Sequence, residues 1–216
     1  MTGPDRLRPP VTFGGRLLSR LVDTMARAVG LPRRNDLGWP RFEGGLPHPG
    51  RPLVLVHGFG VDGSTMLQLG RQLVRRHRVV IPDLPGFGRH RTPPGFTDDG
   101  GPGIEPFLRA LDDLLDRLEL VEPILVGSSM GGAIVANYAA SRPRRPGGLV
   151  LMGPGGIEPP IDSEVFAAAK RDEHLLKVED LDSFGQVYDM NFVEPPFMPV
   201  WMRRIVVAEA APRAVE

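Results

Sequence analysis

The stretch that decides the fold reads ILVGSSMGG, residues 124–132, and the apolar segment 133–140 follows it. The first part predicts a buried strand over 124–126, and the segment after it predicts a helix. Between them stands the pattern G-x-S-x-G, with Ser129 at its centre. In such a turn the serine backbone is strained, and the flanking glycines are needed because side chains there would clash. We therefore expect Ser129 at the tip of a strand-to-helix turn, with its side chain facing a cavity.

Further short apolar runs alternate with helical patterns on both sides of this stretch. Continuous apolar strands that alternate with helices are typical of a parallel sheet covered on both faces, so the sequence predicts an α/β fold. The other expected strands are 53–57, 78–81 and 149–152, with a short one near 41–43. The other expected helices are 15–29, 66–76 (with Ser64 or Thr65 as N-cap) and 107–118.

The pattern along the chain divides it into three parts. Residues 1–35 form an N-terminal extension with an amphipathic helix, and residues 36–155 form the core. Residues 156–216 show helices broken by prolines and no further apolar strand.

The composition excludes several classes of protein. Apolar residues make up 41% and charged residues 24%, as in ordinary soluble domains. The chain has no cysteine, which excludes disulfide scaffolds and cysteine nucleophiles. Lysine plus arginine equals aspartate plus glutamate at 26 each, so no nucleic-acid partner is indicated. Residues 1–91 nevertheless hold 15 arginines against 6 acids. This asymmetry fits either solvated charges or a basic face toward anionic lipid.

The N-terminal helix has an apolar side and a basic side. Its apolar residues are Leu17, Leu18, Leu21, Val22, Met25 and Val29, and its basic residues are Arg16, Arg20 and Arg27. The favoured interpretation is packing on its own domain, and the alternative is peripheral contact with a membrane surface. The charges interrupt any signal-peptide pattern, so we expect a cytoplasmic protein. If the helix contacts a membrane surface, the protein is membrane-associated.

A second motif, His57-Gly58-Phe59-Gly60, directly follows the strand 53–57. A backbone N–H at this place can join the one after the nucleophile in an oxyanion hole, so the candidate donors are the amides of Phe59 and Met130. We expect a structural role for His57 rather than a catalytic one. Residues 58–63 also match G-x-G-x-x-G, with Asp83 after the next strand. That spacing keeps a dinucleotide-binding protein as an alternative.

Three motifs in order, HGFG, DLPGFG at 83–88 and GSSMGG, resemble the α/β-hydrolase superfamily over roughly residues 40–155. Within it, the chain is similar to monoacylglycerol-lipase-like esterases, and its segment 150–156 resembles meta-cleavage product hydrolases. The resemblance implies that Ser129 is the nucleophile, with Phe59 and Met130 as oxyanion donors and Asp83 as a turn residue. It also implies hydrolysis of a small-molecule carboxylic ester, with no metal or organic cofactor. C–C bond hydrolysis by the same fold is the alternative.

The chain departs from the family after the nucleophile. The family places an acid and then a histidine there, whereas only His174 follows Ser129, in a segment expected to be a solvated helix. His48, His77 and His90 precede the nucleophile and receive no role. This departure implies that residues 156–216 are an incomplete helical lid and that the chain is a poor catalyst or a non-catalytic remnant. In the family further strands follow in the sheet at this place, so the strand 149–152 is also expected to be an exposed apolar edge, which is an aggregation hazard.

The segment after residue 180 is rich in large apolar side chains. We expect part of it to face Ser129 and to form an acyl-binding wall, with packing within the lid as the alternative. These residues are Phe184, Val187, Tyr188, Met190, Phe192, Phe197, Met198, Trp201 and Met202.

Overall fold

The computed structural model describes residues 12–45, 50–90, 103–142, 146–157, 167, 168, 171, 176 and 178–210. These residues belong to two compact units. The first holds residues 12–21 and those described from 167 onward, and the second runs from Val22 to Ile157. The boundary lies inside helix α1 (Phe13–Ala28), because the second half of that helix packs on the sheet. The sequence places the start of the core later, at residue 36.

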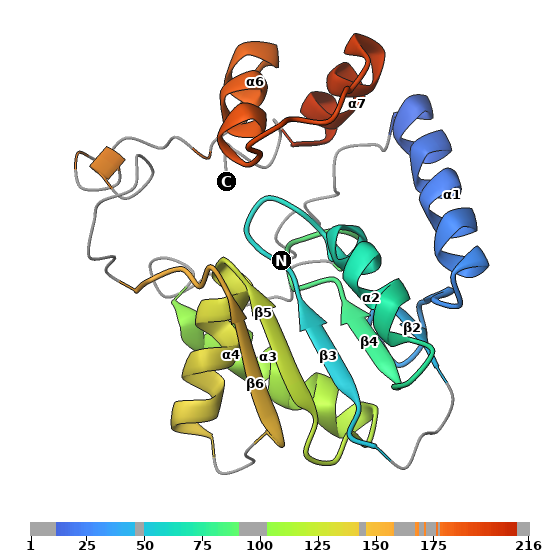
Figure 1. Ribbon diagram of the computed structural model, residues 1–216, viewed down its shortest axis with the longest axis vertical. Coiled ribbons are helices and arrows are strands. Elements are labelled where there is room, and N and C mark those ends of the chain that lie inside the picture. Colours follow the sequence, from blue (N-terminus) through green and yellow to red (C-terminus); the bar gives the residue numbers. More distant parts are fainter. Residues whose placement is uncertain are drawn as a thin grey trace, which may run out of the picture. The chain divides into compact units, whose positions relative to one another are not determined.

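The second unit is built on a sheet in the order β1-β2-β4-β3-β5-β6 (Figure 1). The strands β4, β3, β5 and β6 are parallel, whereas β1 and β2 join antiparallel at one edge. The predicted α/β fold with a mostly parallel sheet is therefore confirmed. The strands are β1 (Arg33–Arg34), β2 (Arg41–Gly44), β3 (Leu53–Val56), β4 (Val79–Pro82), β5 (Ile124–Ser128) and β6 (Gly148–Met152).

Helices cover both faces of the sheet, because its aliphatic strands carry side chains on alternating sides. Val54 and Val56 belong to one buried cluster together with α3 and α4. Leu53 and Leu55 belong to the other, which includes Val74 just after α2 and Ala26 of α1. The helices of this unit besides α1 are α2 (Leu67–Leu73), α3 (Ile104–Arg117) and α4 (Met130–Ser141).

The start of α2 differs from the expected one. A 3₁₀ turn, Gly63–Met66, precedes the helix, and the Asp62 side chain caps this turn by accepting the Ser64 N–H at 2.8 Å. The expected N-caps Ser64 and Thr65 are thus inside the turn, and this prediction was wrong. The physical reason is that a tighter 3₁₀ turn precedes the helix. The backbone therefore becomes helical earlier than the spacing of the apolar residues indicates.

The strand β6 lies at the free edge of the sheet and pairs only with β5 among the described strands. Its four aliphatic side chains, Leu149 to Met152, are each 39–46% exposed. The expected apolar edge is therefore confirmed for the part of the chain that the structure describes.

The described residues of the first unit include the helices α6 (Leu181–Met190) and α7 (Val200–Ala210). The start of α6 is fixed by a capping box, in which Asp180 accepts the Ser183 N–H and Ser183 binds back to the Asp180 backbone. In the same unit, Gly14 of α1 lies against the Ile205 side chain of α7. The helical character expected for this segment is confirmed for these residues.

Candidate active site

The turn between β5 and α4 holds Ser129 in an unusual backbone conformation, with φ 52° and ψ −119°. A serine with positive φ costs about 1–3 kcal/mol, and such strain persists only where its surroundings enforce it. A Cβ on Gly127 would lie 2.3 Å from the Gly131 carbonyl oxygen, and one on Gly131 would lie 2.4 Å from the Val56 carbonyl oxygen. Both glycines are therefore sterically required. The structure places Ser129 at the tip of the turn, exposed to solvent, as the motif predicts.

Two segments hold this turn from either side. The Ser129 N–H donates to the Met152 carbonyl at 3.0 Å, and the Ser129 carbonyl accepts the Gly155 N–H at 2.9 Å. On the other side, a Cβ on Gly58 would lie 3.2 Å from the Ser129 Cβ and 3.7 Å from its Oγ. The loop after β3 and the loop after β6 thus bracket Ser129. The sequence motifs identify only the loop after β3. The loop after β6 was not predicted, because Met152 and Gly155 contact Ser129 through backbone groups.

The two expected oxyanion donors lie in the elements that flank Ser129. Met130 is the first residue of α4, where a helix leaves its N–H groups without intrahelical partners and favours negative charge. Phe59 follows Gly58 in the adjacent loop, and its ring packs edge-on against Phe87 at 5.8 Å. Within the described part of the chain, neither amide donates a hydrogen bond. Among the described residues, both amides thus remain available to a ligand.

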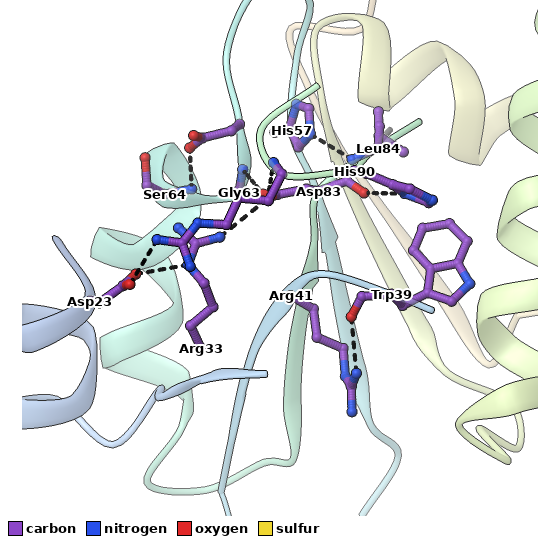
Figure 2. Close-up of polar contacts among 12 residues, drawn as sticks. Asp23, Arg33, Trp39, Arg41, His57, Gly63, Ser64, Asp83, Leu84 and His90 are labelled. Carbon is purple, nitrogen blue, oxygen red and sulfur yellow. Dashed lines mark hydrogen bonds and ion pairs between the residues drawn. The ribbon is translucent and has the colours of Figure 1, made fainter. Parts of the chain in front are cut away.

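The loop that carries Phe59 is held at both ends by two consecutive residues. At its start, the Leu84 N–H donates to His57 Nε2 at 3.0 Å. At its end, the Gly63 N–H donates to Asp83 Oδ1 at 3.0 Å. Figure 2 shows both bonds converging on the segment after β4. We call this arrangement of His57, Gly63, Asp83 and Leu84 the loop clamp.

His57 has no ring nitrogen left for catalysis. It is fully buried, and since Nε2 accepts the Leu84 N–H, Nδ1 carries the proton and donates to the Gly58 carbonyl at 2.8 Å. Burial lowers the pKa of His57, because the charged imidazolium loses its hydration there. The neutral ring therefore supports the loop, in agreement with the structural role expected for it.

The Asp83 carboxylate is also committed to the fold. It is fully buried and accepts the N–H groups of Gly63 and Arg89, and Arg33 Nη1 lies 3.2 Å from its Oδ2. A carboxylate engaged in this way cannot bind a ribose hydroxyl. The spacing that suggested dinucleotide binding therefore has another cause, since Asp83 closes the loop from within.

An ion-pair chain connects the loop clamp to helix α1 (Figure 2). Arg33, which pairs with Asp83, also donates to Asp23 at 2.8 Å, and Arg89 reaches Asp23 at the same distance. Burial alone raises the pKa of Asp23, but hydrogen bonds and charges of the two arginines outweigh it and lower the pKa. The sequence did not predict these ion pairs, because the paired residues are 10 to 66 positions apart and no sequence motif links them.

The described residues supply no base to Ser129. Its Oγ has no hydrogen-bond partner among them. The His90 ring is bound to the Asp83 carbonyl and packs edge-on against Trp39 at 4.4 Å, and His77 lies beside β4 at the amino ends of the strands. His48 and His174 lie outside the described residues. The three described histidines therefore leave the nucleophile position without a proton acceptor.

Two hollows of the core, of about 500 and 430 Å³, do not include Ser129 or the expected oxyanion donors among their lining residues. They are lined by residues that precede β3, β4 and β5, among them Arg51, Arg78 and Glu122. Ligands of open α/β sheets bind at the carboxyl ends of the strands instead, where Ser129 lies. Neither hollow includes Ser129, so the expectation that it faces a cavity stays a prediction.

The family model described as "alpha/beta hydrolase fold" matches residues 51–171, which include all three motifs. The chain belongs to the α/β-hydrolase fold family. Lipase 1 of Psychrobacter immobilis is 31% identical over 161 residues, which are 74% of this chain and 49% of that lipase. A 2-hydroxy-6-oxo-2,4-heptadienoate hydrolase of Pseudomonas putida is 41% identical over 112 residues, which are 50% of this chain and 39% of that enzyme.

Solved structures of α/β-hydrolases agree with this assignment. A bacterial membrane phospholipase A superposes with a TM-score of 0.81 at 28% identity, over 93% of this chain and 64% of that one. A lipase from Acinetobacter baumannii gives 0.79 at 21% identity, over 99% of this chain and 69% of that one. This α/β-hydrolase chain spans about half the length of the curated relatives it matches, or less.

Proposed function

We propose that this chain carries the nucleophile and oxyanion hole of a serine hydrolase that acts on carboxylic esters. The observation that carries the proposal is the strained turn at Ser129, with φ 52°. Strain of this kind clusters at active sites, and here the loop that carries Phe59 lies directly beside it. The lipase names of relatives fit an ester substrate, and those names describe those proteins.

In the proposed mechanism each group has a step. Ser129 Oγ attacks the ester carbonyl carbon, and the carbonyl electrons become an oxyanion that the Phe59 and Met130 amides bind. Collapse of this intermediate breaks the bond to the alcohol and leaves the acyl group on Ser129. Water then releases the acid and restores the serine. A base must take the Oγ proton and return it to the leaving alkoxide, which is the role that a histidine fills in such sites.

The same machinery would serve C–C bond hydrolysis, and one observation favours this second candidate. The heptadienoate hydrolase is the relative with 41% identity, although over 112 residues only. In that case Ser129 and the two amides act on a ketone rather than an ester. The apolar wall expected from residues 184–202 stays a prediction in either case, and it favours a hydrophobic substrate.

Active-site labelling tests the assignment of the nucleophile. An alkyl fluorophosphonate forms a P–O bond to the serine oxygen and expels fluoride, and peptide mass mapping locates the adduct. We expect slow labelling at Ser129, which persists in Ser128→Ala and disappears in Ser129→Ala. Ser128 is the matched control because it is the neighbouring serine, at the end of β5. Equal labelling of wild type and Ser129→Ala, or none of either, would contradict the proposal.

Substrate choice separates the two candidates. A p-nitrophenyl ester reports ester hydrolysis by release of p-nitrophenol, and a 2-hydroxy-6-oxodienoate reports C–C cleavage by loss of its conjugated absorbance. We expect Ser129-dependent turnover, however slow, with the ester. Turnover of the dienoate alone would favour the second candidate.

A further inference from the structure

Helix α1 has a second apolar side that stays largely exposed, although the Ile205 side chain of α7 lies against Gly14 at its first turn. The inner side holds Ala26, which is 1% exposed, and it packs with Leu31 on the sheet. The chain leaves the helix at Gly30, with φ 82°, where the Leu31 N–H bonds back to the Ala26 carbonyl. Asp23 holds the same side through Arg33 and Arg89. The second half of the helix, from Val22 onward, is therefore fixed on the core.

The outer side shows large apolar residues at every fourth position. Phe13, Leu17, Leu21 and Met25 are 78%, 61%, 52% and 60% exposed. At 3.6 residues per turn, positions four apart lie on one face, so these four side chains form a continuous stripe over the whole helix. The apolar residues that the sequence assigns to one side thus divide between two sides. Val22 and Val29 pack inward, whereas this outer stripe faces solvent.

A row of arginines lies beside the outer stripe. Arg16, Arg20 and Arg27 are all exposed, and at 100° per residue they share the helix side next to Phe13. The one acid of α1, Asp23, is held by Arg33 and Arg89. The outward surface of α1 is therefore apolar and cationic without a compensating acid on the same helix. This pairing complements the acyl region and the anionic headgroups of a lipid surface.

We propose that the outer side of α1, formed by Phe13, Leu17, Leu21 and Met25 with the flanking arginines, binds an anionic lipid surface. The helix lies in the plane of the interface, with the stripe in the acyl boundary and the guanidinium groups among phosphates. No helix in the described part of the chain is long and apolar enough to cross a bilayer. The contact is thus peripheral. It uses no residue of the loop clamp or of the Ser129 turn, so it does not depend on the proposed ester hydrolysis.

Vesicle flotation of the full chain tests this proposal, because aggregates do not float. The vesicles are phosphatidylcholine alone or an equal mixture with phosphatidylglycerol. The stripe variant is Phe13→Ser/Leu17→Ser/Leu21→Ser, and the charge variant is Arg16→Gln/Arg27→Gln. Val121→Ser is the control, because Val121 is 73% exposed and follows α3. Ser129→Ala tests independence from catalysis, and far-UV circular dichroism confirms that each variant is folded.

We expect wild type, Val121→Ser and Ser129→Ala to float with the anionic vesicles only. The stripe variant loses more than about tenfold in affinity, because its apolar area no longer enters the acyl boundary. The charge variant loses about fivefold per arginine, and high salt reproduces this loss in the wild type. Wild type that stays unbound, or a stripe variant that floats as well as wild type, would overturn the proposal and leave the stripe to a protein partner.

Discussion

The strands β3 and β6 have nearly the same sequence, LVLV and LVLM, yet opposite surroundings. Both pair in parallel with β5, and both lead into a loop that contacts Ser129. The side chains of β3 are at most 5% exposed, whereas those of Leu149 to Met152 are 39–46% exposed. The difference comes from position, because β3 has strands on both sides and β6 has one neighbour among the described strands. Apolar composition therefore marks a strand as suited to burial, and its place in the sheet decides whether it is buried.

A matched pair of truncations measures this difference. Leu55→Ala in β3 removes a fully buried side chain, which costs about 3–5 kcal/mol in the free energy of unfolding. Leu151→Ala in β6 removes a side chain that is already 39% exposed, and we expect less than about 1 kcal/mol. Urea denaturation followed by circular dichroism checks both values. Equal losses would show that β6 is covered in solution.

The loop clamp sharpens the comparison on the β3 side. Asp83→Asn removes the charge that accepts two N–H groups and pairs with Arg33, and we expect a loss of about 1.5–3 kcal/mol in unfolding free energy. Asp113→Asn is the control, because Asp113 receives the Trp39 indole and Arg117 at a more exposed site. A loss no larger than that of the control would show that the clamp contributes little to stability.

The pH dependence of stability reports on His57. Its pKa is lower in the folded chain than in the unfolded chain, so below about pH 6.5 the unfolded chain binds the extra proton. The contribution of the neutral His57 to the free energy of unfolding is therefore fully present above that pH. It decreases as the pH drops toward the pKa of the folded chain, by up to about 1.4 kcal/mol per pH unit. Asp23, with its lowered pKa, adds a loss only at more acidic pH, near and below the ordinary aspartate pKa of about 3.9.

Denaturation midpoints between pH 5 and 7.5 test this assignment, with His57→Gln beside wild type. The variant is less stable throughout, because it loses a buried hydrogen bond, but its stability changes less with pH. An unchanged slope in the variant would assign the titration to another group.

The smallest expected effect concerns the strained turn itself. Ser129→Gly relieves a positive φ that serine tolerates poorly, so we expect a gain of about 1 kcal/mol in unfolding free energy. Ser129→Ala keeps the strain and serves as the comparison. A calorimetric melt that shows no gain for Ser129→Gly would mean that the turn relaxes without strain in solution.

Much of the site could be predicted because a few residues determine it locally. The G-x-S-x-G spacing leaves no other residue type at Gly127 or Gly131, where a Cβ would lie within 2.5 Å of backbone atoms. The position of β6 at the edge of the described sheet was also predicted, from the comparison with the sheet of the family that the motifs resemble. The loop clamp did not, because its partners are 20 and 27 positions apart and two of them act through backbone N–H groups. The 20-residue spacing to Asp83 was visible, but the sequence alone could not tell a clamp from a nucleotide site.

The most direct test of the account is ester hydrolysis by the 216-residue chain. The central claim is that Ser129 and its oxyanion donors are in place while the described residues give it no base. Loss of one member of a serine triad costs roughly 10⁴- to 10⁶-fold in kcat, and the oxyanion hole alone retains about 10³-fold over water. With p-nitrophenyl butyrate we expect turnover well below about 1 s⁻¹, which Ser129→Ala lowers further and His174→Ala leaves close to wild type. Turnover above about 1 s⁻¹ that Ser129→Ala abolishes would contradict the account, and its loss in His174→Ala would identify the base.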